Sequence, residues 1–219
     1  MRPVVLVGAG AHGRGTLEIL RARRAAGLEA PEVVGFVDDG QTPAEVGGLP
    51  VLGPVAGLVE RGGADGLDVI LAVAGARAKR ALAARLAGAG VGFATAVHPS
   101  VITATGVTFA EGAIVGAGVV IAYDTTVEAH TTINLGATVG HDCVVGRYST
   151  IAPGVNITGN VRIGEGCEIQ TNATIVPGVT LGDGVRVGPG AVLLKDAAAG
   201  GFYMGNPARR MPDPGGQGA

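Results

Sequence analysis

The chain has 219 residues, a formal net charge of −2 and a hydrophobic content of 47%. Because it carries no basic run, its charge argues against a nucleic-acid partner. It also lacks an apolar run of the roughly 18 residues that a membrane span needs, and its opening segment is too short for a signal peptide. We therefore expect a cytoplasmic protein without membrane insertion.

The first part of the chain alternates buried strands with helices. Residues 3–7 form a continuous apolar run, which is typical of a strand covered on both faces of a parallel sheet. Similar runs recur and are separated by helix-like segments, which predicts an α/β, Rossmann-like half domain over residues 1–97. The expected elements are strands at 3–7, 32–37 and 67–73 and helices at 16–26 and 77–87.

A glycine-rich loop joins the first expected strand to the first expected helix. The spacing Gly8-x-Gly10-x-x-Gly13 lets backbone N–H groups approach phosphate oxygens. Asp38 ends the second strand, where an acidic residue meets a ribose hydroxyl in nucleotide-binding folds. The loop is also compatible with a tight turn that binds nothing, and His12 either caps the helix or touches a ligand. The domain is short for a whole dinucleotide, which favours a single nucleotide over NAD.

A six-residue repeat fills residues 107–196. Its sixth place is Gly, Asn or Asp in thirteen of fifteen units, and these residues tolerate a left-handed backbone at a sharp corner. Its third place is apolar in all fifteen units. Such a unit is one side of a triangular β-solenoid coil, so residues eighteen apart are expected to stack. The third-place residues are Phe109, Val115, Ile121, Val127, Ile133, Val139, Val145, Ile151, Ile157, Ile163, Ile169, Ile175, Leu181, Val187 and Leu193.

His141 is the only histidine in a fifth place of the repeat, and Asp142 follows it in a sixth place. The adjacent carboxylate is expected to raise the basicity of the imidazole, which suits a general base near neutral pH. Tyr123 lies one coil below, and Gly159, one coil above, is expected to leave room for a ligand. Taken alone, Asp142 is better explained as an ordinary corner residue. His130 is interpreted as structural, since histidine tolerates left-handed backbone.

The remaining histidines and cysteines do not predict a metal site or a nucleophile. His98, His130 and His141 occupy different places of the repeat with no two one coil apart, so no zinc site is expected. Cys143 has no evident base partner. Cys143 and Cys167 fall on different sides of the coil, and we interpret both as small core residues of a reduced protein.

The hexads resemble those of the left-handed β-helix acyltransferases, and residues 4 to about 211 are similar to the sugar O/N-acetyltransferases of the sialic-acid and bacillosamine type. This resemblance implies a left-handed parallel β-helix over residues 98–200 after the Rossmann-like domain. The Pro/Gly-rich end predicts a C-terminal tail, 201–219, that is partly disordered. The motifs that carry the resemblance are Gly8–Gly13, Asp38-Asp39, His98-Pro99, Asn134, Gly140–Gly146 and Gly205–Ala208.

The resemblance also implies a homotrimer with acetyl-CoA as co-substrate in the groove between two solenoids, and no metal. His141 would remove a proton from the attacking sugar amine, and Asp142 would support its basicity. Thr150 stands where relatives often carry a second histidine, and Asp142 is shorter than the more frequent Glu. The implied nucleotide-sugar contacts are Gly10, Ala11, His12, Asp38, Asp39 and Gly75, and the implied acetyl-CoA contacts are Asn134, Thr150, Thr171, Gly188 and Pro189.

These features predict an acetyl-CoA-dependent N-acetyltransferase that acts on the amine of a nucleotide-linked amino sugar, with UDP as the expected nucleotide. Transfer would be direct, without a covalent enzyme intermediate. An O-acetyltransferase acting on the hydroxyl of a sialic acid needs the same base and stays open as an alternative. So does a non-catalytic trimeric scaffold that binds a nucleotide. The glycine loop alone would also allow an NAD-dependent oxidoreductase, which the rest of the chain disfavours.

Overall fold

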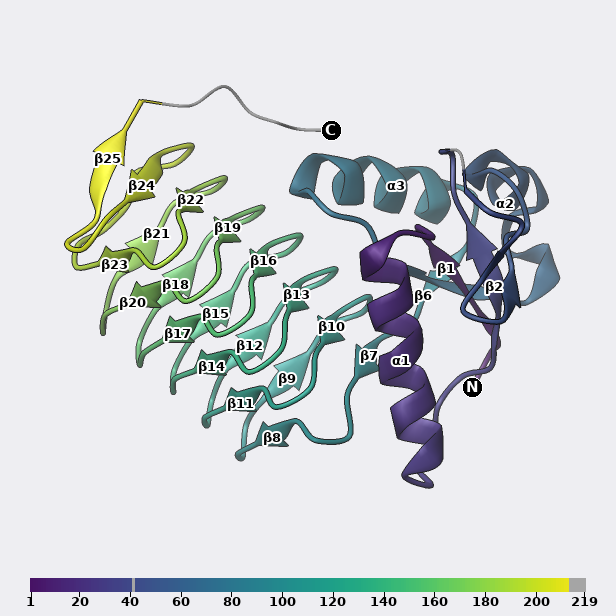
Figure 1. Cartoon of the computed structure of the whole chain (residues 1–219), viewed down its shortest axis with the longest axis horizontal. Coiled ribbons are helices and arrows are strands. Elements are labelled where there is room, and N and C mark those ends of the chain that lie inside the picture. Colours follow the sequence, from purple (N-terminus) through teal and green to yellow (C-terminus); the bar gives the residue numbers. More distant parts are fainter. Residues whose placement is uncertain (41, 213–219) are drawn as a thin grey trace. The chain divides into compact units, whose positions relative to one another are not determined.

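The computed structural model of the chain describes residues 1–40 and 42–212 (Figure 1). The chain divides into two compact units. One unit comprises residues 1–74 and 78–99, and the other comprises residues 75–77 and the chain from residue 100 onward. Each unit has its own buried core, so each is described by itself.

The first unit contains a four-stranded parallel sheet with the order β2-β1-β5-β6 (Figure 1). The four residues of β1 are all buried, which explains their continuous apolar sequence. The chain starts in the central strand and then adds strands on both sides, as in half of a doubly wound fold. The elements are β1 Val4–Val7, α1 Ala11–Ala25, β2 Val33–Val37, β3 Glu45–Val46, β4 Leu49–Pro50, α2 Val55–Arg61, η1 Gly62–Asp65, β5 Asp68–Leu71, α3 Ala76–Gly88, β6 Gly92–Phe93 and β7 Ala96–Val97.

Helix α1 begins at Ala11, so the expected helix over residues 16–26 started five residues too late. Gly10 is its N-cap, with an extended backbone, and the N–H of Arg14 donates to the carbonyl of Gly10 at 3.1 Å. The end of the glycine-rich loop is therefore already helical. Apolar periodicity could not reveal this turn, because residues 11–15 carry no large apolar side chain.

The second unit is a solenoid with three faces of short parallel strands (Figure 1). The β13 face has the order β10-β13-β16-β19-β22-β24-β25, the β14 face has β8-β11-β14-β17-β20-β23, and the β15 face has β9-β12-β15-β18-β21. The strands are β8 Ile102–Thr103, β9 Thr108–Phe109, β10 Ile114–Val115, β11 Val120–Ile121, β12 Thr126–Val127, β13 Thr132–Ile133, β14 Thr138–Val139, β15 Val144–Val145, β16 Thr150–Ile151, β17 Asn156–Ile157, β18 Arg162–Ile163, β19 Glu168–Ile169, β20 Thr174–Ile175, β21 Thr180–Leu181, β22 Arg186–Val187, β23 Val192–Leu193, β24 Phe202–Met204 and β25 Arg209–Met211.

The strand register confirms the predicted coil of three hexads. Thr132 pairs with Thr150 and Val139 with Ile157, so partners are eighteen residues apart. Every third-place residue is buried except Phe109, which is half-buried. The first-place residues are buried as well, except Val107. Two side chains per hexad therefore fill the interior, which explains why the first place is restricted to small or β-branched types.

The corners have the left-handed backbone that their composition predicts. The sixth-place residues with positive φ other than glycine are Asp124, His130, Asp142, Tyr148, Asn160 and Asn172.

After the last coil, β24 and β25 form an antiparallel pair. The predicted disorder at the end of the tail concerns residues 212–219, and all of these except Pro212 lie outside the described residues. Among the helices that the structure describes, none is long and apolar enough to span a membrane.

Candidate active site

His141 occupies the corner between β14 and β15, and backbone hydrogen bonds fix this corner from both neighbouring coils. The N–H of Asp142 donates to the carbonyl of Tyr123 at 3.1 Å, and the N–H of Asn160 donates to the carbonyl of His141 at 2.8 Å. Asp142 itself has a φ of 57°, which turns the chain sharply. The residue type at Asp142 therefore serves the turn, as expected, while its side chain stays available for another contact.

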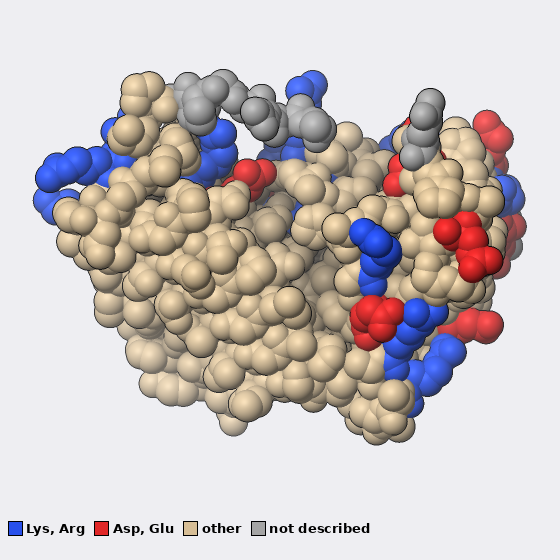
Figure 2. Space-filling model, viewed as in Figure 1, with Lys and Arg blue, Asp and Glu red and all other residues tan. Residues whose placement is uncertain are grey.

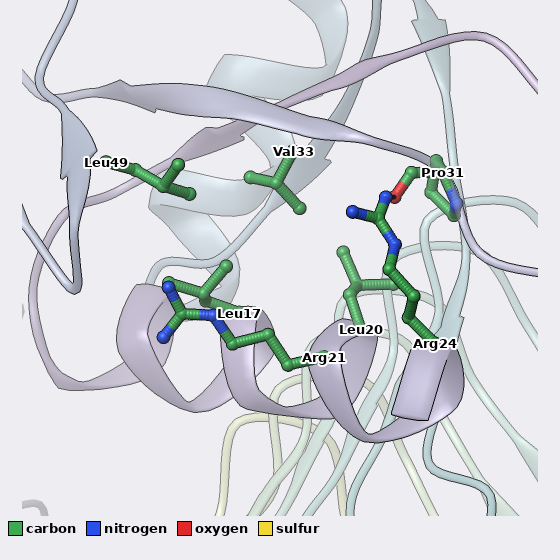
Figure 3. A pocket seen from close by; sticks show the side chains of 7 residues that line it. All are labelled: Leu17, Leu20, Arg21, Arg24, Pro31, Val33 and Leu49. Atoms are coloured by element: carbon green, nitrogen blue, oxygen red, sulfur yellow. Dashed lines mark hydrogen bonds between the residues drawn. The ribbon is translucent and has the colours of Figure 1, made fainter. Parts of the chain in front are cut away.

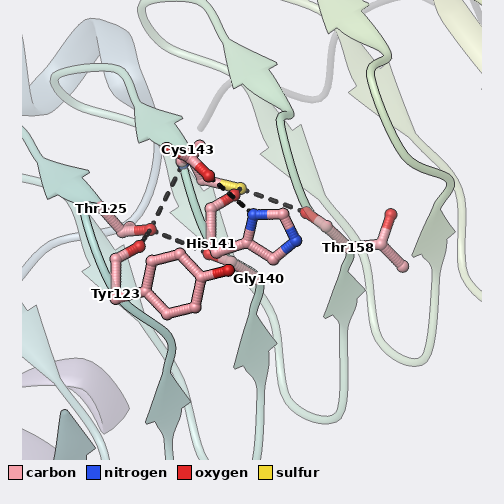
Figure 4. A network of polar contacts seen from close by, with 7 residues as sticks. Tyr123, Thr125, Gly140, His141, Cys143 and Thr158 are labelled. Carbon is pink, nitrogen blue, oxygen red and sulfur yellow. Dashed lines mark hydrogen bonds and ion pairs between the residues drawn. The ribbon is translucent and has the colours of Figure 1, made fainter. Parts of the chain in front are cut away.

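That contact is with the imidazole. Nδ1 of His141 lies 2.7 Å from Oδ2 of Asp142, and the ring stacks on Tyr123 with a centroid distance of 5.1 Å and an interplanar angle of 13° (Figure 4). The carboxylate favours the tautomer with its proton on Nδ1. Nε2 then keeps a lone pair, which can accept a proton. The side chain of His141 is 41% exposed, so the ring can be reached from solvent.

Gly159 does not leave the room for a ligand that the sequence suggested. A Cβ at Gly159 would lie 2.5 Å from Nε2 of His141, so the imidazole itself occupies the space above the glycine. The ring is held between Tyr123 on one side and Gly159 on the other. The glycine therefore admits the histidine conformation, and a ligand must approach from the exposed edge of the ring.

In the first unit, the glycine loop is shaped by two close contacts. A Cβ at Gly8 would meet the carbonyl oxygen of Ala72, and one at Gly13 would overlap the carbonyl oxygen of Gly8. At Gly10 a Cβ would meet nothing, so only this glycine of the three faces open space. Gly75, which follows β5, also has no atom near its Cβ position.

The two predicted acidic residues are both engaged with backbone groups. Asp38 accepts hydrogen bonds from the N–H of Ala9 at 2.7 Å and from the N–H of Gly40 at 2.8 Å. Asp39 accepts one from the N–H of Val55, the first residue of α2, at 2.8 Å. Asp38 therefore ties the glycine loop to the end of β2, a structural role that the sequence analysis did not include.

His12 lies in the first turn of α1, next to exposed Gly10 and Ala11. No side chain caps this helix, so of the two roles considered for His12 capping is excluded. Partial burial, and secondarily the positive charge of Lys79, lower the pKa of His12 below its ordinary value of 6.5. The imidazole is therefore neutral at pH 7 and can offer one donor and one acceptor.

The residues expected to contact acetyl-CoA lie on a different edge from His141. Asn134, Thr171, Gly188 and Pro189 follow strands of the β13 face, whereas His141 follows a strand of the β14 face. Asn134 donates its side-chain N–H to the carbonyl of Ile151 at 3.0 Å, and Gly188 is buried against Met204. Thr150 is half-buried within β16. One solenoid alone therefore does not bring these residues to the imidazole.

A cavity of about 410 Å³ lies at the C-terminal end of the solenoid. Its lining combines apolar side chains with Lys195 and Arg209, and Lys and Arg gather at this end in Figure 2. Lys195 is in the same corner column as His141, three coils further along. This feature was not predicted from the sequence, although Lys195, like His141, is a titratable residue in the fifth place of its hexad. The lining residues are Leu193, Leu194, Lys195, Asp196, Tyr203, Pro207, Ala208 and Arg209.

A second cavity, of about 170 Å³, lies in the first unit between α1 and the strands β2 and β4 (Figure 3). None of the predicted nucleotide-binding residues lines it. Its lining consists of Leu17, Leu20, Arg21, Arg24, Pro31, Val33 and Leu49. Within the described ranges 1–40 and 42–212, no cluster of three His, Cys, Asp or Glu side chains could hold a metal ion.

Two family models match the chain: the PglD N-terminal domain over residues 3–86 and the bacterial transferase hexapeptide (six repeats) over residues 160–195. No curated protein sequence matches it.

Among solved structures, the H141N mutant of perosamine N-acetyltransferase from Caulobacter crescentus, in complex with CoA and GDP-perosamine, is 32% identical with a TM-score of 0.89. The alignment covers 96% of this chain and 97% of that one. The acetyltransferase domain of PglB from Neisseria gonorrhoeae, in complex with acetyl coenzyme A, is 31% identical over 96% of this chain and 99% of that chain, with a TM-score of 0.86. WeeI from Acinetobacter baumannii is 27% identical, with a TM-score of 0.85 and coverage of 96% and 100%.

These comparisons confirm the predicted fold, an α/β unit followed by a left-handed β-helix. With more than 30% identity over nearly the whole length of two acetyltransferases, the chain belongs to the hexapeptide-repeat sugar N-acetyltransferases of the left-handed β-helix superfamily and is an acyltransferase.

Proposed function

We propose that the chain transfers the acetyl group of acetyl-CoA to the amine of a nucleotide-linked amino sugar, with His141 as the general base. The observation that carries the proposal is the geometry of one imidazole. Its Nδ1 faces a carboxylate at 2.7 Å, its ring lies between Tyr123 and Gly159, and its side chain is 41% exposed. This arrangement suits the removal of a proton from an attacking nucleophile.

The reaction that fits is direct aminolysis of a thioester. The amine nitrogen bonds to the thioester carbonyl carbon, and the bond from that carbon to the CoA sulfur breaks. His141 takes the proton that the nitrogen loses, and the imidazolium so formed passes it to the departing sulfur, which leaves as the free thiol. Asp142 holds the imidazole in the required tautomer and stabilises the imidazolium that forms. Cys143 takes no part as a nucleophile, because burial raises the pKa of its thiol.

The cavity beside Lys195 and Arg209 supports a site for the phosphate-bearing end of acetyl-CoA. Its two cationic side chains attract phosphate, and its apolar lining suits an aromatic base. It lies three coils from His141 on the same corner, a distance of about 14 Å at the usual strand spacing. An extended pantetheine arm spans such a distance, so the thioester would reach the imidazole.

The homotrimer remains part of the proposal, and two features support it. The predicted acetyl-CoA contacts and His141 lie on different edges, so a neighbouring copy is needed to bring both together. The outward-facing residues of the β14 face carry no charge, and Ile102 and Val120 are 63% and 40% exposed. Figure 2 shows a broad area over the solenoid strands without charged side chains. Light scattering of the purified chain is expected to give three times the 21.5 kDa chain mass, and the mass of one chain would contradict the proposal.

The acceptor class is expected to be a nucleoside-diphosphate amino sugar held by the first unit, through Gly10, Ala11 and His12. UDP remains the predicted nucleotide, and GDP-perosamine is the sugar nucleotide bound in the Caulobacter structure. The test is to incubate the protein with acetyl-CoA and a panel of UDP-linked amino sugars and GDP-perosamine, and to follow free thiol. Turnover with an amine and not with the matching hydroxyl sugar is expected. Thiol release only with hydroxyl acceptors, such as a sialic acid, would overturn the N-acetyltransferase proposal.

A further inference from the structure

The inner side of the active-site corner is closed by one buried hydroxyl group (Figure 4). Thr125 is completely buried, and its Oγ1 donates to the carbonyl of Gly140 at 2.8 Å and accepts from the N–H of Cys143 at 3.3 Å. Gly140 precedes His141, and Cys143 follows Asp142. A single side chain therefore joins the two ends of the turn that carries the imidazole.

Cys143 extends this contact to the next coil. Its Sγ lies 3.1 Å from the carbonyl oxygen of Thr158 and 3.4 Å from that of His141. Because the thiol is buried among carbonyl oxygens, it stays protonated and donates to them. The backbone of His141 is thus held from the interior by Thr125 and Cys143, while Asp142 and Tyr123 hold its ring from outside.

The same hydrogen-bonding motif occurs at a corner that carries no candidate catalytic residue. Ser149 donates to the carbonyl of Gly164 at 3.0 Å and accepts from the N–H of Cys167 at 2.9 Å. Thr131, one corner after Thr125, donates to the carbonyl of Gly146 at 3.0 Å and is also completely buried. The motif therefore recurs in this solenoid. Thr125 differs from Ser149 in that its turn carries His141, and it differs from Thr131 also in accepting the hydrogen bond from the N–H of Cys143.

We propose that Thr125 is a positioning residue for the reaction: its hydroxyl holds the turn of residues 140–143 so that Nε2 of His141 stays aligned with the substrate. This inference depends on the proposed function. Replacing the hydroxyl by a methyl group would leave Gly140 O and Cys143 N without this partner in the interior, and the turn would shift to recover hydrogen bonds. A shift of a catalytic group by about 1 Å lowers a rate by roughly a hundredfold.

The test compares Thr125→Val with Thr131→Val, the same substitution at two completely buried sites. Both are expected to lower the unfolding midpoint, and Thr125→Val is expected to lower it more because it also removes the partner of the Cys143 N–H. Thr125→Val is expected to lower kcat by roughly 10- to 100-fold with little change in KM for acetyl-CoA, whereas Thr131→Val retains kcat. Thr125→Ser, which keeps the hydroxyl, is expected to restore most of the rate. Equal kcat in the two valine variants would overturn the proposal.

Thr125→Cys keeps the proposal testable if Thr125→Val does not fold, because cysteine already occupies this place of the repeat at positions 143 and 167. Its weaker donor is expected to lower kcat less than valine does. Nitrogen NMR of the His141 ring adds a readout without substrate: the fraction with the proton on Nδ1 should fall in Thr125→Cys and not in Thr131→Cys. An unchanged fraction together with an unchanged kcat would contradict the proposal.

His141→Ala in the same assays separates this inference from the proposed function. Loss of turnover in His141→Ala together with normal turnover in Thr125→Val would contradict the positioning role of Thr125 and leave the general-base role of His141 in place. Normal turnover in His141→Ala would remove the general base and the positioning role with it.

Discussion

Two corners of the solenoid contain a histidine stacked on a tyrosine one coil away, yet they differ in exposure. At one corner, Tyr123 lies below His141, with ring centroids 5.1 Å apart. At the other, Tyr148 lies above His130, with centroids 5.3 Å apart. Each imidazole is covered on its second face by a glycine, Gly159 and Gly112 respectively.

The difference between the two corners comes from one step along the hexad. His130 occupies the sixth place with a φ of 57° and is only 5% exposed. His141 occupies the fifth place, and the left-handed conformation belongs to Asp142 after it. The side chain of His141 is therefore presented outward, with a carboxylate beside it. A stacked histidine in the sixth place is therefore buried and serves packing, whereas one in the fifth place is exposed and can contact a substrate.

The largest expected effect separates the two histidines. His141→Ala should lower kcat by roughly 10²–10⁴-fold, because the general base is lost, and should leave the unfolding midpoint nearly unchanged because the side chain is partly exposed. His130→Ala should lower the free energy of unfolding by about 1–3 kcal/mol and retain kcat per folded molecule. Thiol-release kinetics and thermal unfolding measure both quantities. A loss of kcat in His130→Ala without a loss of stability would contradict the assignment of a packing role to His130.

A smaller effect is expected at the glycines. Gly159 lies outside the left-handed region, so the backbone accepts alanine there, and the only consequence is contact of the new Cβ with His141. Gly159→Ala should displace the imidazole and lower kcat by about a hundredfold. The matched change Gly112→Ala acts at a φ of 71° and against buried His130, so it should reduce stability and not kcat. Normal kcat in Gly159→Ala would show that the ring does not depend on this glycine.

The smallest expected effect is the pH dependence of stability that comes from the two buried cysteines, Cys143 and Cys167. Burial raises the pKa of Cys167 from its ordinary value of 9.0 to about 11, and it raises that of Cys143 to a smaller extent. Below pH 9.0 the thiol is protonated in both the folded and the unfolded chain, so its contribution to stability is complete. Between pH 9.0 and about 11 the unfolded chain loses the proton first, and the free energy of unfolding falls by up to about 3 kcal/mol.

Chemical unfolding of Cys167→Ala across this pH range isolates the contribution, because other groups titrate equally in both proteins. The variant should show a weaker pH dependence than the original chain, and Cys143→Ala should show a smaller change. Identical pH dependence in all three would contradict the stated origin of the effect.

Much of the solenoid could be predicted from the sequence because its rule is local. Within each hexad, the residue types identify the inward-facing position and the corner position. Because three hexads make one coil, residues eighteen apart stack. The same rule made His141 visible against the other corner residues. It also placed Tyr123 and Gly159 next to the imidazole. The prediction that Gly159 leaves room for a ligand was wrong, because the stacking rule does not show that the imidazole itself fills the space beside the glycine.

Other features depend on contacts that no local pattern encodes. The first turn of α1 has no apolar periodicity, so its start was placed too late. Asp38 was expected to face a ribose, and only the three-dimensional structure shows its contacts with the loop backbone. Thr125 looked like any small first-place residue. Its importance appears only when its hydroxyl is seen to reach both ends of the turn.

The regular stacking of coils has a consequence for how such an enzyme matches the length of its acyl donor. Every coil offers an equivalent position on the corner that carries His141, and these positions hold Tyr123, Gly159, Pro177 and Lys195. A base moved to a neighbouring position would change its separation from the cavity beside Lys195 by one strand spacing, about 4.8 Å. The distance between the general base and the site for the far end of the acyl donor is therefore a whole number of strand spacings, fixed by the number of coils between them.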